Sequence, residues 1–374
     1  IPTPGVAFLT RNQRAAAGVV ISASHNPYED NGIKLFNPEG TKLSDREETQ
    51  IETLIREEAS ESLRDALGNQ VGSIQMMKES RKQYLAFLLR SLTPDFNLNG
   101  LKIVLDCSNG AVSAVAPSLF DGLGAELTIL HNKPNGTNIN HQCGSEHPES
   151  LRRKVLETGA DVGLALDGDG DRLIAVDETG HILTGDQLLA IGARFLYKRG
   201  QLMNNVLVST VMSNLGLKES LKSIGIRHVT SRVGDRHVME KMMDCKASLG
   251  GEDSGHIIYR GYHTTGDGLL SALKLTETLL EEERPLSDLA KFMTVYPQTL
   301  INVPINEKPA LETLDNVNDA IQKVEETLGN QGRVLVRYSG TQQICRVMVE
   351  GPTQDAAENG AHDSAIAVAD TIGN

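Results

Sequence analysis

The chain has 374 residues, a formal net charge of −13, and a composition that is 39% hydrophobic and 23% charged. This length exceeds one compact core, so we expect two to four domains, and the ordinary globular composition excludes a fibrous or disordered chain. The negative charge repels nucleic acid and anionic membrane surfaces, and no basic run opposes it. We therefore expect neither nucleic acid nor a membrane as a partner.

Cysteine usage and hydropathy indicate the compartment. The cysteines are Cys107, Cys143, Cys245 and Cys345. Their scattered positions lack C-x-x-C spacing, which argues against a zinc site and against a disulfide framework. No apolar stretch approaches the roughly 18 residues that span a bilayer, and no signal-peptide pattern opens the chain. These features predict a cytoplasmic protein.

Short apolar runs rich in Val and Ile predict buried strands. They cover residues 19–21, 103–105, 162–166 and 206–208. Helical spacing follows the first run at Ile51, Leu54 and Ile55, after Ser44-Asp45-Arg46-Glu47, which matches a capping box. A further helix is expected over 269–283. The alternation predicts α/β layers with mostly parallel sheets.

Polar and Pro-containing breaks suggest the domain boundaries. The break at 94–100 precedes a strand, and Pro285 and Pro297 follow the helix expected at 269–283. The last part of the chain contains two strands, at 333–337 and 345–350. We predict four domains, over residues 1–95, 96–195, 196–293 and 294–374.

The segment from Val162 to Arg172 is the most informative in the chain. Asp167, Asp169 and Asp171 alternate with glycines directly after an apolar strand. Residues two apart share a face of an extended chain, and glycines let the backbone curl, so the three carboxylates can meet one hard cation. The pattern predicts a metal site, with Mg²⁺ as its natural occupant.

A calcium EF-hand is the main alternative for this segment, since Glu178 would supply its last ligand. The sixth loop position is Arg172, where that loop needs Gly. In addition, residues 173–176 have the pattern of a strand. We therefore reject the EF-hand.

A serine follows the first apolar run. Ser24 lies in Ser22-Ala23-Ser24-His25-Asn26-Pro27, at a strand end and before an Asn-Pro turn. Such a serine can carry a phosphoryl group, although the same letters also suit a plain turn. Phosphoryl transfer needs an acceptor oxygen, a metal and nearby cations, and Lys34 and Arg172 would supply the positive charge.

These loops resemble those of the α-D-phosphohexomutase superfamily, and most closely its phosphoglucosamine mutase branch. Four family loops occur in order, at residues 22–27, 167–172, 251–256 and 337–341. The match covers essentially the whole chain. The resemblance implies a multi-domain α/β fold, in which three similar mixed α/β domains and a C-terminal α+β domain surround a central cleft.

The resemblance also implies roles for individual residues. Ser24 would be the phosphoserine, and with Asp167, Asp169 and Asp171 it would hold Mg²⁺. Lys34, Arg172 and His256 would be catalytic and are the candidates for taking the hydroxyl proton. Glu252 and Ser254 would bind the sugar. The phosphate that is not transferred would be bound by Arg337, Ser339, Gly340, Thr341 and Arg346.

The implied enzyme is a phosphomutase of the isomerase class. It would interconvert glucosamine 6-phosphate and glucosamine 1-phosphate through a 1,6-bisphosphate, feeding UDP-N-acetylglucosamine and cell-wall precursor synthesis. Glucosamine 1,6-bisphosphate or glucose 1,6-bisphosphate would be the activator, and the chain would be a monomer or homodimer. The elements at 138–149, among them Asn-Ile-Asn and Cys-Gly-Ser, favour the glucosamine branch.

Three departures from the family pattern keep alternatives open. Asp253 stands where the branch usually has Gln, and Gln342-Gln343 stands where Glu-Pro is usual, so a phosphoglucomutase or phosphomannomutase is one alternative. The family's opening strand and an arginine-bearing segment are absent before Ile1, so we expect a first domain that is incomplete at its N-terminus. A non-catalytic binder of metal or phosphosugar is therefore the other alternative.

Overall fold

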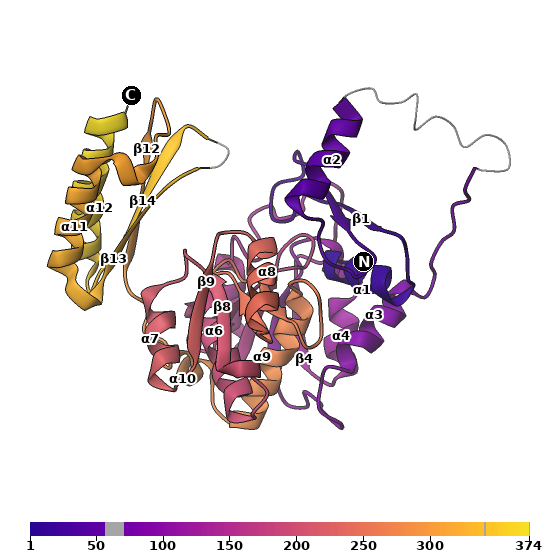
Figure 1. The fold of residues 1–374 in the computed structure, drawn as a ribbon. Coiled ribbons are helices and arrows are strands. Elements are labelled where there is room, and N and C mark those ends of the chain that lie inside the picture. The colour runs from indigo at the N-terminus through magenta and orange to yellow at the C-terminus, as the bar shows by residue number, and fades with distance from the viewer. Residues whose placement is uncertain (57–70, 340–341, 374) are drawn as a thin grey trace. The chain divides into compact units, whose positions relative to one another are not determined.

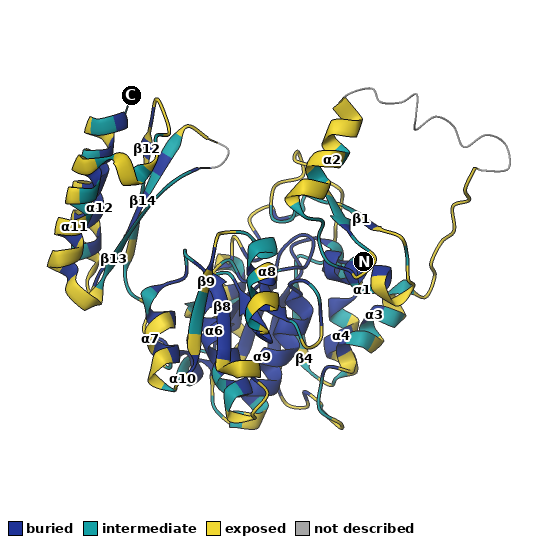
Figure 2. Ribbon diagram, in the orientation of Figure 1, coloured by how far each residue is buried: buried dark blue, intermediate teal, exposed yellow. Residues whose placement is uncertain are grey.

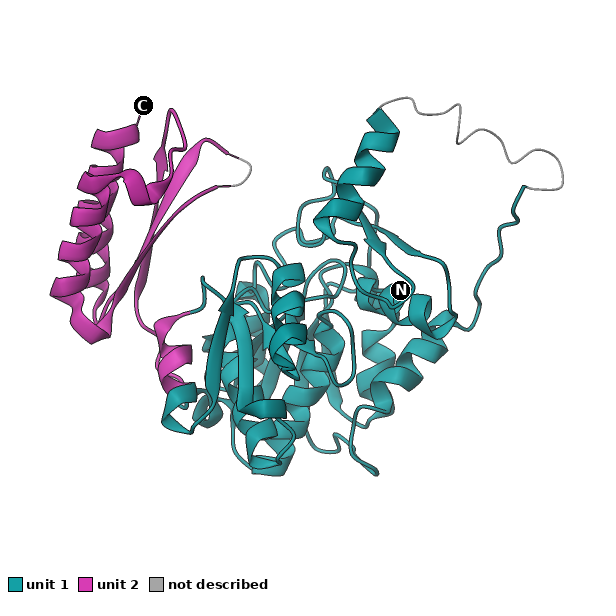
Figure 3. Cartoon of the chain, in the orientation of Figure 1, with its two compact units in different colours: residues 1–213, 221–292 teal, residues 214–220, 293–374 magenta. Residues whose placement is uncertain are grey.

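The computed structural model describes residues 1–56, 71–339 and 342–373. The chain forms two compact units (Figure 3). Unit 1 comprises Ile1–Ser213 and Leu221–Phe292, and unit 2 comprises Asn214–Ser220 and Met293–Asn374. Helix α7 (Leu215–Ser223) begins in unit 2 and ends in unit 1.

The described residues of unit 1 form three sheets (Figure 1). The first pairs β1 (Gly18–Ile21) with β2 (Ile33–Phe36). The second has the order β4 (Glu126–Leu130), β3 (Lys102–Asp106), β5 (Val162–Leu166), β6 (Leu173–Asp177) and β7 (Ile182–Leu183). The third has the order β11 (Ile257–Tyr259), β10 (Leu249–Gly251), β8 (Val206–Thr210) and β9 (Arg227–Ser231).

The described part of unit 1 also contains helices. They are α1 (Thr3–Asn12), α2 (Asp45–Arg56), α3 (Ser80–Leu89), α4 (Ala116–Gly122), α5 (Glu149–Thr158), α6 (Gly185–Lys198), α8 (Asp235–Cys245), α9 (Gly268–Glu282) and α10 (Leu286–Ala290). Short 3-10 helices cover Ala111–Ala114 and Met203–Asn205. Helix α5 packs on β3 and β5, and α8 packs on β8 and β10. The strands β3, β5, β6 and β8 are therefore almost entirely buried (Figure 2).

Two expectations about the sheets are wrong. The run at 19–21 is a strand, as predicted, but Val19 is 56% and Ile21 75% exposed. It belongs to a two-stranded ribbon, and α1 packs against it, so alternate side chains of the strand face away from the protein. The sheets are also not mostly parallel. The pairs β3–β4, β3–β5, β8–β9 and β8–β10 are parallel, whereas every other pair of described strands is antiparallel.

Several local predictions are confirmed. Ser44 N donates to Glu47 Oε2 at 2.8 Å, and Glu47 N donates back to Ser44 Oγ at 3.4 Å, which is the expected capping box of α2. The helix predicted at 269–283 is α9. Its N-cap is Asp267, whose Oδ1 accepts from Leu269 N and Leu270 N, both at 3.0 Å. All four cysteines are free.

Unit 2 is a three-stranded antiparallel sheet with two helices on one face (Figure 1). The strand order is β12 (Gln298–Pro304), β14 (Ile344–Glu350) and β13 (Arg333–Tyr338), and the helices are α11 (Asp315–Leu328) and α12 (Gln354–Ile372). Short 3-10 helices cover Leu311–Thr313 and Gly329–Gln331. Apolar residues of the sheet and of both helices form a core of their own. Among the described residues of the chain, no helix is both long and apolar enough to cross a bilayer.

An ion pair with a buried carboxylate is expected to stabilise unit 2. The Glu350 side chain is fully buried and accepts from Arg333 Nε at 2.7 Å, Arg333 Nη2 at 3.2 Å and Leu215 N at 3.0 Å. Glu350→Ala removes the acceptor of these three hydrogen bonds, two of them charge-assisted, so it should lower the free energy of unfolding of unit 2 by about 3 kcal/mol.

Urea denaturation followed by hydrogen exchange in β14 measures this loss. The control is Glu358→Ala, at an exposed position on α12, with an expected change below about 0.5 kcal/mol. Equal effects of the two substitutions would show that the ion pair contributes nothing.

Candidate functional site

The three aspartates lie in the connection between β5 and β6. Asp167, Asp169 and Asp171 are buried, and ligand oxygens of all three lie within 4.8 Å of one another. Among the described residues, Asp169 Oδ1 and Asp171 Oδ1 have no hydrogen-bond partner. Burial, with the neighbouring carboxylates of Asp171 and Asp169, raises the pKa of Asp167. The turn has left-handed backbone at Gly170, where φ is +77°.

This cluster fits a hard divalent cation. Its donors are carboxylate oxygens only, which is the set that Mg²⁺ prefers, and the two oxygens without partners are available as ligands. Three buried carboxylates at such short range repel one another unless positive charge lies among them. The residues present therefore suit the metal that the sequence predicts.

Lys34 supplies the nearest positive charge. It projects from β2, and its Nζ lies 2.5 Å from Asp169 Oδ2 and 3.2 Å from Asp171 Oδ2. Burial alone would lower the pKa of Lys34, but the carboxylates of Asp171 and Asp169 outweigh it and raise this pKa above its usual value. Asp169 Oδ2 also accepts from Thr3 Oγ1 at 2.6 Å. Lys34 is therefore a stable cation beside the aspartates.

Ser24 meets the same cluster from the loop after β1. Its Oγ donates to Asp167 Oδ2 at 2.7 Å, across 143 residues of sequence. The backbone of Ser24 is left-handed, with φ +55°, and Ser24 N donates to Ser22 Oγ at 3.0 Å. A non-glycine residue with positive φ is uncommon and often marks a functional site. The hydroxyl thus lies at the edge of the metal cluster, half-buried.

Arg172 and His256 border the cluster on other sides. Arg172 N donates to Asp167 Oδ1 at 3.1 Å, and its Nη1 donates to Glu146 Oε1 at 2.9 Å. The His256 ring is buried, with Nδ1 3.6 Å from Asp171 Oδ1 and Nε2 3.5 Å from an oxygen of Asp235. Burial lowers the pKa of His256, but Asp171 and Asp235 raise it by more.

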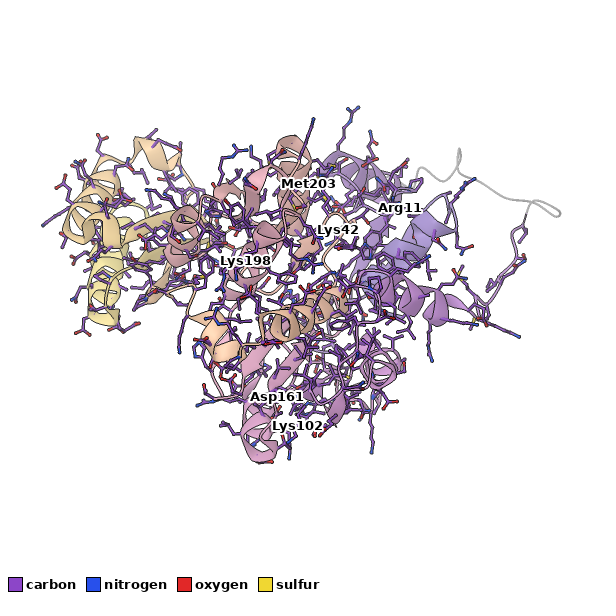
Figure 4. The ribbon with its side chains drawn as sticks, turned by 90° about the horizontal axis from the view of Figure 1, so that it is seen from below. Arg11, Lys42, Lys102, Asp161, Lys198 and Met203 are labelled. Atoms are coloured by element: carbon purple, nitrogen blue, oxygen red, sulfur yellow. The ribbon has the colours of Figure 1, made fainter. Side chains whose placement is uncertain are left out.

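Sequence reasoning missed Asp235 as part of this arrangement. Asp235 also lies 2.5 Å from Nζ of Lys42, which Figure 4 labels. Lys42 and Asp235 line a depression together with Lys34 and Arg236. No local sequence pattern links Asp235 to the aspartate loop. Asp235 comes close to His256 because α8 packs beside β10.

The loop after β10 carries the predicted sugar ligands. Glu252 and Ser254 are half-buried, and Glu252 Oε1 accepts from Gly234 N at 2.9 Å. Between them, Asp253 Oδ1 accepts from Asp186 N at 3.2 Å, and the Asp253 carbonyl accepts from Gly185 N at 2.9 Å. Asp253, which departs from the family pattern, therefore anchors the first turn of α6.

The predicted phosphate loop belongs to unit 2. Arg337 on β13 and Arg346 on β14 are directly paired across the sheet. The Nε atom of each is buried without a partner among the described residues, and burial together with Arg346 lowers the pKa of Arg337. Ser339 is buried, and its Oγ accepts from Gln342 N at 3.2 Å. Two adjacent guanidinium groups favour an anion. Gly340 and Thr341 lie outside the described residues.

The structure thus brings Ser24, Lys34, the three aspartates, Arg172 and His256 into one site in unit 1. Glu252 and Ser254 belong to the same unit. The pair of arginines is a separate group within unit 2.

A second group of possible metal ligands consists of Asp106, His131 and Cys143. Both oxygens of Asp106 are already engaged. Oδ1 accepts from Ser108 N at 2.9 Å, while Oδ2 accepts from Gly144 N at 3.1 Å and lies 2.9 Å from His131 Nδ1. Burial raises the pKa of the Cys143 thiol to about 12, which disfavours the thiolate that a metal needs. We interpret this group as a support for the surrounding loops.

The contact between His131 and Asp106 predicts that the stability of the fold depends on pH. The contact with Asp106 raises the pKa of His131 above its ordinary value of about 6.5. The charged imidazole then stabilises the fold fully below that pH, and this stability is lost as pH rises through the folded pKa. NMR titration of the ring should show the raised pKa, and Asp106→Asn should return it toward 6.5. A titration unchanged by that substitution would contradict the role of Asp106.

Family models and curated proteins that match this chain agree with one another. Four family models match in chain order, described as Phosphoglucomutase/phosphomannomutase alpha/beta/alpha domain I at residues 1–62, domain II at 82–180, domain III at 184–296 and C-terminal domain at 300–367. The phosphoglucosamine mutase of Syntrophus aciditrophicus is 50% identical over 355 residues, covering 95% of this chain and 79% of that protein. The phosphoglucosamine mutase of Protochlamydia amoebophila is 47% identical over 373 residues, covering 100% and 81%.

Solved structures show the same fold at lower identity. A phosphoglucomutase/phosphomannomutase family protein from Burkholderia thailandensis superposes with a TM-score of 0.80 at 24% identity, covering 99% of this chain and 81% of that one. The N-acetylphosphoglucosamine mutase of Aspergillus fumigatus, in complex with GlcNAc-6P and magnesium, has a TM-score of 0.76 at 18% identity, covering 99% and 92%.

Proposed function

This chain belongs to the phosphoglucomutase/phosphomannomutase family, and from that membership we propose that it interconverts glucosamine 6-phosphate and glucosamine 1-phosphate. It is a phosphomutase, an enzyme of the isomerase class. The choice of sugar is supported by relatives about half identical to it, which are phosphoglucosamine mutases. Relatives of that name favour glucosamine over glucose or mannose and favour an enzyme over a non-catalytic binder.

The observation that carries the mechanism is the contact of Ser24 Oγ with Asp167, beside two further carboxylates and Lys34. In the proposed reaction, the O–P bond of phosphoserine 24 breaks while a new O–P bond forms to the free hydroxyl of the sugar phosphate; that hydroxyl gives up its proton, and the released Ser24 oxygen takes one up. The product is a 1,6-bisphosphate. The bisphosphate then reorients within the site. Its other phosphoryl group is transferred to Ser24, and the isomeric monophosphate leaves.

The surrounding residues have distinct proposed roles. Asp167, Asp169 and Asp171, with the Ser24 phosphate, would hold Mg²⁺, which spreads the negative charge of the transferring group when bound. Lys34 and Arg172 would add fixed positive charge, and His256 would orient Asp171 or accept the hydroxyl proton. The other candidates expected from the sequence, Lys34 and Arg172, stay positively charged, Lys34 because the carboxylates of Asp171 and Asp169 raise its pKa, so His256 is the proposed acceptor of that proton. The 1,6-bisphosphate of glucosamine or glucose would serve as activator.

Substrate binding is proposed for two further groups. Glu252 and Ser254 would bind sugar hydroxyls. Arg337, Ser339, Gly340, Thr341 and Arg346 would bind the phosphate that is not transferred, since two adjacent guanidinium groups match a dianion. The division into domains 1–95, 96–195, 196–293 and 294–374, a cytoplasmic location and a monomer or homodimer remain predictions.

A side-by-side assay of glucosamine, glucose and mannose phosphates tests the function. With Mg²⁺ and the matching 1,6-bisphosphate present, kcat/KM should be highest for the glucosamine phosphates. A clear preference for glucose 1-phosphate would overturn the choice of sugar. Absence of turnover, with no phosphoryl group found on Ser24 by mass spectrometry, would favour the non-catalytic binder.

A further inference from the structure

Asn140 connects the two loops that carry the chemistry. It lies between β4 and α5, and its Nδ2 donates to the carbonyl of Ser24 at 2.9 Å and to the carbonyl of Asn26 at 2.8 Å. The residue is only 7% exposed, although it belongs to a loop far from Ser24 in the sequence. One buried amide therefore spans the serine loop.

The backbone of Ser24 needs such a support. With φ +55° it holds a conformation that a serine rarely adopts. A turn of this kind offers its carbonyls no regular helix or strand partner, so an external donor decides how firmly it is held. Asn140 donates to two of these carbonyls, on either side of His25.

The same amide lies against the metal loop. A Cβ atom added to Gly168 would come within 2.6 Å of both Asn140 Nδ2 and the Ser24 carbonyl. Gly168 stands between Asp167 and Asp169, so the bridge from Asn140 to Ser24 packs directly on the backbone that presents these carboxylates.

Hydrogen bonds through Ser108 fix the backbone position of Asn140. Asn140 N donates to the Ser108 carbonyl at 3.0 Å, and Ser108 N donates to Asp106 Oδ1 at 2.9 Å. Ser108 Oγ also donates to the carbonyl of Leu166, the residue before Asp167. One rigid support thus holds both the amide of Asn140 and the start of the metal loop.

We propose that Asn140 is a positioning residue for phosphoryl transfer. Its side-chain amide holds the Ser24 peptide so that the serine oxygen stays at the aspartate cluster. This inference rests on the proposed function, and it concerns placement of the reacting oxygen, so it predicts an effect on kcat with little effect on KM.

Two substitutions separate the donor from the shape of the side chain. Asn140→Gly removes the amide without backbone strain, because φ is +57° at this position. Asn140→Asp keeps the shape of the side chain but replaces the donor Nδ2 with an oxygen, which cannot donate to the two carbonyls when ionised. The matched control is Asn138→Ala in the same loop, where Nδ2 donates to Lys133 O at 3.1 Å and Oδ1 accepts from Asn135 N at 3.0 Å.

Steady-state kinetics with glucosamine 6-phosphate and hydrogen exchange of residues 22–27 are the two measurements. Both Asn140 variants should lower kcat by about 10- to 100-fold with KM within about twofold. Exchange in 22–27 should be about tenfold faster in Asn140→Gly. Asn138→Ala should change neither.

Two outcomes would overturn the proposal. One is an Asn140→Asp enzyme with the kcat of the parent, which would show that shape alone matters, and the other is unchanged exchange of 22–27 in Asn140→Gly. If Asn140→Asp does not fold, the glycine variant decides alone. If the parent does not turn over glucosamine 6-phosphate, the proposed function fails, and the exchange measurement still decides whether Asn140 holds the serine loop.

Discussion

Replacing Asp169 with Ala is expected to reduce mutase turnover by at least about 10³-fold while leaving the fold intact. The Asp169 carboxylate has one oxygen without a partner and a second that contacts Thr3 and Lys34. Lys34 keeps Asp171 as a partner when Asp169 is lost. Loss of the acceptor for Thr3 costs about 1 kcal/mol, and relief of repulsion among three buried carboxylates offsets it. The thermal midpoint should therefore stay within a few degrees of the parent.

Calorimetric titration with Mg²⁺ and a turnover assay check this expectation. Asp169→Asn keeps the shape and should be as inactive and as weak in Mg²⁺ binding as Asp169→Ala. Asp121→Asn, at an exposed position on α4, is the control and should behave as the parent. Normal turnover of Asp169→Ala in Mg²⁺ would sink the proposed role of the carboxylate.

Replacing Ser24 with Ala is expected to abolish phosphoryl transfer, because the variant has no oxygen to carry the group. The loss should be at least about 10³-fold in turnover, and no phosphoryl group should be found on the loop peptide after incubation with the 1,6-bisphosphate. Mass spectrometry of residues 22–27 measures this directly.

Ser22→Ala is the matched control, since this second hydroxyl of the same loop accepts from Ser24 N and does not contact an aspartate in any described interaction. The Ser22 variant should still take up one phosphoryl group. Phosphate uptake by Ser24→Ala with none by Ser22→Ala would move the proposed nucleophile to Ser22.

Local features of the fold were predictable from the sequence because they depend on neighbouring residues. The capping box at Ser44 and Glu47, the helix expected at 269–283 and the strand after Arg172 are all confirmed. The burial of 19–21 and the direction of the sheets were not predictable, since an apolar run does not state what will cover it or which strand will pair with it. Val19 and Ile21 are exposed because β1 belongs to a two-stranded ribbon.

The site divides in the same way. Spacing alone indicated that Asp167, Asp169 and Asp171 form a cation site, because two-residue spacing with glycines between is a local geometric property. Spacing did not reveal Thr3, Glu146 or Asp235 as partners of the site. Thr3 lies 166 residues from Asp169, and although Glu146 is only 26 residues from Arg172 and Asp235 belongs to the same part of the chain as His256, no local pattern places either beside its partner.

The sequence by itself determined the aspartate cluster, the strand that presents it and the family to which the chain belongs, since motif order and local backbone preferences survive without tertiary contacts. Only the tertiary structure decided that Ser24 reaches Asp167 and that Asn140 holds the serine loop. Those contacts join residues more than a hundred positions apart. Their geometry follows from the packing of whole strands and helices, which no local pattern specifies.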